Sequence, residues 1–287
     1  MSICPRRRAG GSRLGPVDMI PTEHPHAIAM HATPIDATKF TGRPSRGGAE
    51  GINLSLAAAS ACIEGSRSLT RALVMVQKLV DGVHAFRSQY FASHRALFRR
   101  LADRGQHPET LFITCSDSRV VPNLITSTEP GDLFIVRNVG NVVPHVTVPG
   151  GTAAAIEYAV EVLGVSTVIV CGHTHCGAVN AILNPETMDR LPFVKRWLAQ
   201  GERVRQIVAE RYAHLDEPTR MLAAVQENVL VQLENLRAFP NVADRLDRGV
   251  LQMSGWVYEI AAGDVFEFDP SSGQFGPIGS SSVPPPL

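Results

Sequence analysis

Hydrophobic positions divide the chain into three regions. The first seventy residues show no sustained periodicity and are rich in Gly, Pro, Ser, Thr and His. From residue 75 to about residue 270, apolar residues recur at the spacings typical of helices and strands. We therefore expect a folded domain over 75–270. Residues 1–74 are expected to be a disordered extension or to precede the true start of synthesis, and residues 271–287, rich in Ser and Pro, a flexible tail.

The first pattern inside the domain predicts helices over 76–101, ended by Gly105. Its apolar positions are Val76, Leu79, Val80, Val83, Phe86, Tyr90, Phe91, Leu97, Phe98 and Leu101. Such a stripe packs either against the core of its own domain or against a partner subunit. The pattern alone leaves both interpretations open.

Short apolar runs then alternate with helical segments. Strands are expected at 111–114, 133–136 and 166–171, and helices at 150–163, 177–183, 189–213 and 216–238. Further strands are expected at 250–253, 255–260 and 265–269. Alternation of strands and helices indicates parallel pairing, because a helix serves as the crossover. The expected fold class is α/β: a mostly parallel central β-sheet flanked by helices, with an N-terminal helical arm and C-terminal strands.

Composition narrows the class of protein. Lys plus Arg and Asp plus Glu number 27 each, so the formal net charge is zero, which argues against a nucleic-acid or anionic-membrane partner. No apolar run approaches the roughly 18 residues that cross a bilayer. The 5 cysteines are few and odd in number, which favours free thiols or metal ligands in a reducing compartment. We therefore expect a cytoplasmic enzyme or binding protein.

Two polar segments follow predicted strands. Residues 114–119 begin where one strand ends, and residues 171–177 begin where another ends. The carboxyl ends of neighbouring parallel strands meet at one edge of a sheet. The segments are therefore expected to bring together Cys115, Asp117, His173 and Cys176.

These side chains suit zinc. Two thiolates and one imidazole are preferred Zn²⁺ ligands and leave the fourth tetrahedral position open. Arg119 can hold Asp117 away from the metal in a bidentate pair, which frees that position for a water whose pKa zinc lowers to about 7. Each residue alone also has a structural interpretation, as a core thiol, a turn residue or a surface ion pair. Cys171 is interpreted as a core residue, and His175 as a side chain that points away from its neighbours.

The same residues carry a family resemblance. Cys115-Ser-Asp-Ser-Arg119, followed by Gly172-His-x-x-Cys-Gly177, resembles the β-class carbonic anhydrases, closest to bacterial and cyanobacterial members. The likeness runs from about residue 76 to residue 269. It includes the motifs Ser93-His-Arg, Gly105-Gln-His-Pro, Pro122-Asn-Leu-Ile, Gly131-Asp-Leu-Phe, Arg137-Asn, Ile156-Glu-Tyr-Ala and Gly255-Trp-Val-Tyr.

The resemblance implies a zinc enzyme for the reversible hydration of carbon dioxide to bicarbonate and a proton. Cys115, His173 and Cys176 would be the zinc ligands, and Asp117 and Arg119 the dyad that orients zinc-bound hydroxide. His175 and His145 are both candidates for relaying the released proton, and the sequence does not choose between them.

The resemblance also implies a substrate pocket and an assembly. Gln106, Phe134 and Tyr158 match the family's CO₂ pocket, to which the neighbouring subunit contributes. A homodimer or a dimer of dimers is therefore implied, with the helices over 76–101 as arms around the partner. The segment 120–123, with Gln106 and Tyr158, resembles the plant-type branch, so activity is expected to survive at pH 7.

Two alternatives remain. Relatives with the same metal site hydrolyse carbon disulfide or carbonyl sulfide, and a member with zinc closed by Asp117 could act as a non-catalytic scaffold or bicarbonate sensor. Arg119, Gln106 and Tyr158 together weigh against the second alternative, because a structural site has no use for them. Carboxysome association has little support, since the segment after Asp269 is short.

Overall fold

The computed structural model describes residues 74–279. The expected N-terminal extension, up to residue 73, lies outside the described residues, as does the end of the expected tail. Among the described residues, those from 77 to 279 belong to the compact unit that contains the sheet. None of the described helices is long and apolar enough to span a membrane.

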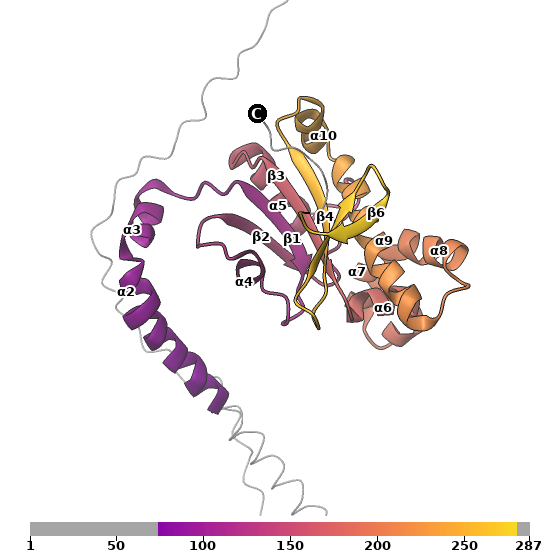
Figure 1. Cartoon of the computed structure of the whole chain (residues 1–287), viewed down its shortest axis with the longest axis horizontal. Helices are drawn as coiled ribbons and strands as arrows, with labels where there is room; N and C mark the ends of the chain where they lie inside the picture. The colour runs from indigo at the N-terminus through magenta and orange to yellow at the C-terminus, as the bar shows by residue number, and fades with distance from the viewer. Residues whose placement is uncertain (1–73, 280–287) are drawn as a thin grey trace, which may run out of the picture. The chain divides into compact units, whose positions relative to one another are not determined.

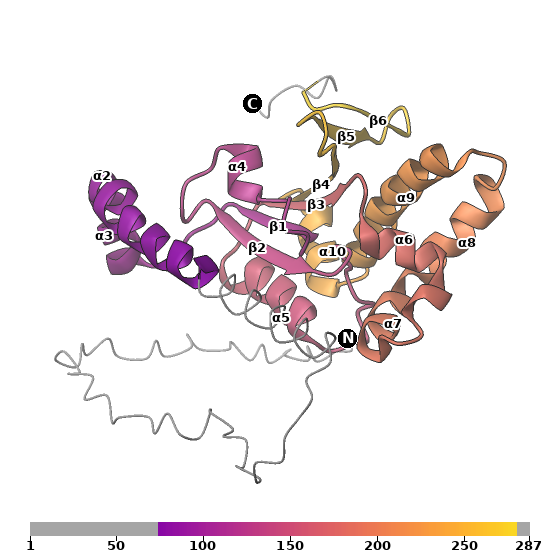
Figure 2. The same cartoon turned by 90° about the horizontal axis from the view of Figure 1, so that it is seen from below.

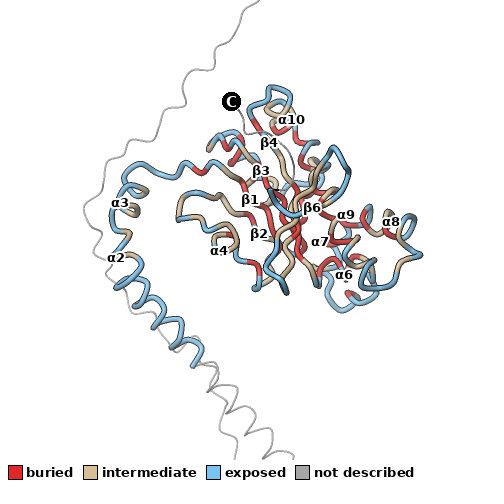
Figure 3. The backbone as a smooth tube through the Cα atoms, in the orientation of Figure 1, coloured by how far each residue is buried: buried red, intermediate tan, exposed pale blue. Residues whose placement is uncertain are grey.

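The predicted helical arm is present. Residues 74–85 are helical and continue through a π-helical turn, η2 (Phe86–Tyr90), into α2 (Phe91–Ser93) and α3 (Arg95–Arg104). Gly105 ends α3 with a φ of 75°, which a side chain rarely adopts. No residue of η2, α2 or α3 is buried, and Figure 3 shows this segment in the colours of exposed and intermediate residues. The apolar stripe is therefore not packed into the core of its own domain.

The six strands form one mixed sheet in the order β2-β1-β3-β4-β5-β6 (Figures 1 and 2). They are β1 (Thr110–Cys115), β2 (Leu133–Asn138), β3 (Thr167–His173), β4 (Gln252–Tyr258), β5 (Val265–Asp269) and β6 (Gln274–Pro277). The first four strands pair in parallel, and β5 and β6 are antiparallel additions. The predicted fold class is confirmed.

The main core lies between one face of this sheet and its helices. Leu111, Ile113, Val168 and Val170 are fully buried on β1 and β3. They share one hydrophobic cluster with residues from three helical elements: α5 (Gly151–Glu157), its π-helical continuation η3 (Tyr158–Val162) and α9 (Glu217–Arg237). Helix α10 (Pro240–Asp247) packs against η3 and α9. Burial of this apolar surface is the main stabilising term of the domain.

Helix α9 approaches β3 and β4 very closely because two strand positions are glycine. A Cβ at Gly172 would lie 2.8 Å from Val229 Cγ2. A Cβ at Gly255 would lie 2.9 Å from the side chains of both Val229 and Leu233. The absence of these two side chains lets α9 lie directly on the strands, next to His173.

Several predictions of local structure need correction. The helix expected over 189–213 begins only at Pro192, which suits the first turn of α7 (Pro192–Leu198), and η4 (Pro185–Met188) precedes it. A 3₁₀ segment, η5 (Ala199–Gly201), then separates α7 from α8 (Glu202–Arg211). The two strands expected around Gly255 are the single strand β4. Strand β6 extends order into the segment expected to be a flexible tail. Helix α10 was not predicted.

Candidate metal centre

The ends of β1 and β3 bring three metal-binding side chains together. Cys115 is the last residue of β1, His173 is the last residue of β3, and Cys176 is the N-cap residue of α6 (Gly177–Leu183). One ligand atom from each lies within 4.8 Å of the other two, and all three residues are buried. The topology therefore assembles the group that the sequence predicted from two distant segments.

The geometry of His173 suits metal binding. Its Nδ1 is 2.9 Å from the carbonyl oxygen of Thr174, an acceptor, so Nδ1 carries the proton in the neutral ring. Its Nε2 is buried and has no hydrogen-bond partner among the residues that the structure describes. A buried lone pair without a partner is costly unless it binds a metal or a donor. The orphaned nitrogen and the two neighbouring thiols fit Zn²⁺.

The two neighbouring thiols shift each other's pKa in opposite directions. A hydrogen bond with Cys176 is the largest cause that lowers the pKa of Cys115, to about 4, and His173 and the backbone N–H of Gly140 lower it further. The same pairing, together with burial, raises the pKa of Cys176. Gly140 N lies 3.4 Å from Cys115 Sγ. A thiolate is the form of cysteine that binds metal, so the lowered pKa of Cys115 favours metal binding at this residue.

Asp117 is held by Arg119 in the turn after β1. Arg119 Nε and Nη2 donate to the two carboxylate oxygens over 2.9 and 2.8 Å, and the backbone N–H of Arg119 donates over 3.0 Å. These bonds hold the pKa of Asp117 well below its usual range. Asp117 Oδ2 lies 3.9 Å from His173 Nε2. The carboxylate therefore stands beside the three-residue group, with both of its oxygens engaged by the guanidinium.

A second arginine secures the same turn. Arg137 Nε donates to the carbonyl oxygen of Cys115 over 3.1 Å, and Arg137 Nη2 donates to that of Asp117 over 2.7 Å. The sequence contained Arg137 only as part of the family motif Arg137-Asn138, and nothing in that motif predicted these contacts. The structure shows that Arg137 of β2 fixes the backbone that carries one candidate ligand, Cys115, and Asp117.

The predicted pocket residues do not gather at this group within one chain. The rings of Phe134 and Tyr158 are 6.0 Å apart, but Gln106 is exposed in the loop before β1. Phe134 pairs with Leu111, whereas Cys115 pairs with Asn138. Leu111 and Cys115 are four residues apart on β1, which corresponds to about 13 Å at roughly 3.3 Å per residue. Phe134 therefore lies at the other end of the sheet from Cys115.

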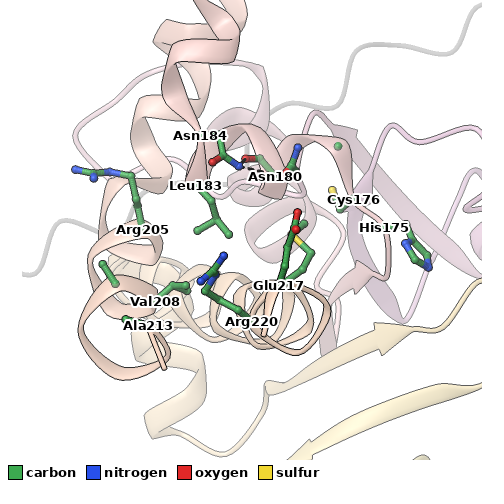
Figure 4. Close-up of a pocket in the computed structure, with 13 residues that line it drawn as sticks. His175, Cys176, Asn180, Leu183, Asn184, Arg205, Val208, Ala213, Glu217 and Arg220 are labelled. Atoms are coloured by element: carbon green, nitrogen blue, oxygen red, sulfur yellow. Dashed lines mark hydrogen bonds between the residues drawn. The ribbon is translucent and has the colours of Figure 1, made fainter. Parts of the chain in front are cut away.

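A cavity of about 630 Å³ borders the metal group on its α6 side (Figure 4). Cys176 and His175 lie at one end of it, and Arg205 and Arg220 come from α8 and α9. His175 has a φ of 56°, and its carbonyl accepts from Arg119 Nη2 over 3.1 Å. Cys171 is buried apart from the three-residue group, and burial raises its pKa to about 12, which agrees with its interpretation as a core residue.

Known proteins resemble this chain in sequence and fold. Residues 110–265 match the family described as carbonic anhydrase. A carbonic anhydrase of Synechocystis sp. is 47% identical over 196 residues, which cover 68% of this chain and 71% of that protein. The solved β-carbonic anhydrase CcaA superposes with a TM-score of 0.70 at 45% identity, covering 72% of this chain and 93% of that one.

A tetrameric β-carbonic anhydrase of Sordaria macrospora matches with a TM-score of 0.59 at 29% identity, covering 73% of this chain and 99% of that one. Zinc is the cofactor of such enzymes, and the Cys115, His173 and Cys176 group can hold a metal ion. The matched domain, the parallel sheet and the buried metal group agree, and the chain belongs to the β class of the carbonic anhydrase family.

Proposed function

We propose that this chain hydrates carbon dioxide reversibly to bicarbonate and a proton, within a catalytic domain over 75–270 that β6 extends. Cys115, His173 and Cys176 hold the zinc, and Asp117 and Arg119 form the catalytic dyad. The observation that carries the proposal is the bidentate Asp117–Arg119 pair beside the buried ligand group. A purely structural zinc site needs no ionised carboxylate held next to it.

Bound zinc supplies Lewis-acid activation of water at neutral pH. Asp117 orients the attacking water. Its carboxylate accepts a hydrogen bond from that water, which directs a lone pair of the water oxygen toward the carbon of CO₂. Arg119 keeps this carboxylate ionised and engages both of its oxygens. This geometry supports the open form of the site, in which Asp117 is not itself a ligand.

The substrate pocket of the proposal needs a second copy of the chain. Phe134 and Tyr158 lie too far along the sheet to line the site of their own subunit. Supplied by the partner, their rings give an apolar wall for a neutral, linear substrate. Gln106 of the partner donates a hydrogen bond to a CO₂ oxygen as negative charge develops there.

The arm supports the same dimer. Leu79, Val80 and Val83 are 64%, 42% and 66% exposed, and Phe86 is 45% exposed. Contiguous apolar surface of this kind marks an interaction site in soluble proteins. We propose that the arm of one copy covers its partner, and that the assembly is a homodimer or a dimer of dimers.

The test is stopped-flow CO₂ hydration by the purified full chain at pH 7 and pH 8.5, with zinc measured on the same sample. The proposal expects one zinc per chain, fast hydration at both pH values, and loss of hydration after the zinc is removed with a chelator. Activity at pH 8.5 alone would show that Asp117 closes the metal site at neutral pH.

The same samples separate the alternatives. Hydrolysis of carbon disulfide or carbonyl sulfide without CO₂ hydration would assign the sulfur substrates. One zinc per chain without either activity would indicate a scaffold or bicarbonate sensor.

A further inference from the structure

A row of buried amides on α9 faces the loop beside the metal group. Asn228 and Gln232 are fully buried, and Asn235 is partly buried. The three residues are four and three positions apart, so they share one face of the helix. Buried amides are costly without partners, which makes their contacts informative.

Each amide binds the backbone of the loop over 139–143 or its neighbour on α9. Asn228 Nδ2 donates to the Gly140 carbonyl over 3.1 Å. Gln232 Nε2 donates to Asn228 Oδ1 over 3.0 Å, and its Oε1 accepts from the Val143 N–H over 2.8 Å. Asn235 Nδ2 donates to the Val143 carbonyl over 3.0 Å. Both ends of the loop are therefore attached to one rigid helix.

The loop is also fixed from inside. The Asn138 side chain accepts from the Val142 N–H over 2.7 Å and donates to the Val142 carbonyl over 2.8 Å. Gly140 and Asn141 adopt φ values of 84° and 47°, a left-handed conformation that glycine and asparagine tolerate better than other residues. A Cβ at Gly140 would lie 3.1 Å from Ala178 Cβ. The surroundings therefore determine this conformation.

This loop touches the metal group through one backbone hydrogen bond, from Gly140 N–H to Cys115 Sγ over 3.4 Å. We propose that Asn228, supported by Gln232 and Asn235, is a positioning residue for the metal–thiolate bond of Cys115. The amides hold the Gly140 peptide so that its N–H points at the sulfur, and the bond fixes the direction of the sulfur lone pairs. The inference rests on the proposed role of Cys115 as a zinc ligand.

The expected effect is on metal affinity. Loss of a partner that orients a metal ligand typically weakens metal binding 10- to 100-fold. Asn228→Leu keeps the volume of the side chain but removes the donor to Gly140. We expect it to weaken zinc binding by roughly 10-fold, the lower end of that range, because Asn138 still holds the loop from inside.

The control is Glu227→Leu, one residue away on α9. Glu227 is also buried, but its carboxylate accepts from the Tyr212 hydroxyl over 2.7 Å and not from the loop over 139–143. Zinc affinity is measured by competition with a chelator. The melting temperatures of the zinc-free and zinc-loaded full chain and the thiolate-to-metal absorption band of the Co²⁺-substituted chain are measured alongside.

A positioning role predicts that Asn228→Leu weakens zinc binding and shifts the Co²⁺ band. It also predicts a smaller difference between the melting temperatures of the zinc-free and zinc-loaded chain. Glu227→Leu should lower both melting temperatures equally. Equal lowering in both variants, with unchanged affinity and band, would overturn the inference. If Asn228→Leu does not fold, the same readouts on Asn235→Leu decide between these outcomes. Retention of zinc by the single variant Cys115→Ser would refute the proposed ligand set instead.

Discussion

Substitution of Gly172 by alanine tests how the sheet positions the metal group. The added Cβ would lie 2.8 Å from Val229 Cγ2 and 3.3 Å from Val225 Cγ1, both on α9. Val229 is fully buried and Val225 nearly so, and neither can swing into solvent. The helix must therefore move away from the strand, or both valines must leave their rotamers.

The cost follows from this overpacking. Inserting a methyl group into a packed core typically costs about 1–3 kcal/mol. In a domain of this size, about 1 kcal/mol lowers the melting temperature by roughly 2–4 °C. We expect Gly172→Ala to lower it by about 2–12 °C, and zinc affinity to fall as well, because Gly172 directly precedes His173.

Thermal and urea unfolding of the full chain measure this effect, with Gly151→Ala as the control. A Cβ at Gly151 meets nothing within 4 Å. The double variant Gly172→Ala/Val229→Ala relieves the closest contact, so its cost should be smaller than the sum of the two single variants by about 0.5–3 kcal/mol. The reasoning is refuted if Gly172→Ala is as stable as Gly151→Ala, or if the two costs add.

Three further predictions concern the proposed site and assembly. Asp117→Asn should keep one zinc per chain and lose CO₂ hydration by about 10²- to 10⁴-fold, and unchanged stopped-flow rates would remove Asp117 from the mechanism. Val83→Glu should dissociate the assembly and abolish hydration. Lys78→Glu, which adds negative charge to the same helix, should do neither, and sedimentation velocity of the two variants shows whether each assembly persists. Because Arg119 lowers the folded-state pKa of Asp117, the full stabilisation from their pairing is present above about pH 5. It declines as pH falls below the unfolded-state pKa of about 4 and is gone once pH has passed the lower folded-state pKa. The stability difference between wild type and Asp117→Asn should therefore be constant from pH 7 to 5, and a decline over that range would contradict the assigned pairing.

The sequence predicted the sheet well because its buried strands are short Val- and Ile-rich runs between clear turn signals. It also predicted the metal group, since Cys115, His173 and Cys176 each follow or end such a run. Parallel pairing of β1 and β3 is enough to bring these ends together. Hydrophobic periodicity and sheet topology together are therefore enough to predict this part of the site.

Other features were hidden because they depend on tertiary contacts. The sequence placed Gly255 at the start of a separate strand, but it lies inside one continuous strand, and the close approach of α9 explains the glycine. Asn228 and Gln232 interrupt an otherwise apolar helix face, and only the structure shows which loop they hold. Buried polar residues on an apolar face were the available signal for the α9 amides.

The separation of Phe134 and Tyr158 from Cys115 likewise required the strand register. The family resemblance grouped these residues in one pocket to which a neighbouring subunit contributes. The register of β1 and β2 adds a geometric argument for that second copy.

The ligand environment of zinc in the purified chain tests the central claim most directly. Metal analysis and zinc-edge X-ray absorption should give one zinc per chain with two sulfur ligands near 2.3 Å and two lighter ligands at roughly 2.0–2.2 Å, one of them from His173. The same chain with Cys115→Ser should lose zinc and CO₂ hydration together. No bound zinc, a different number of sulfur ligands, or hydration that survives Cys115→Ser would contradict the account.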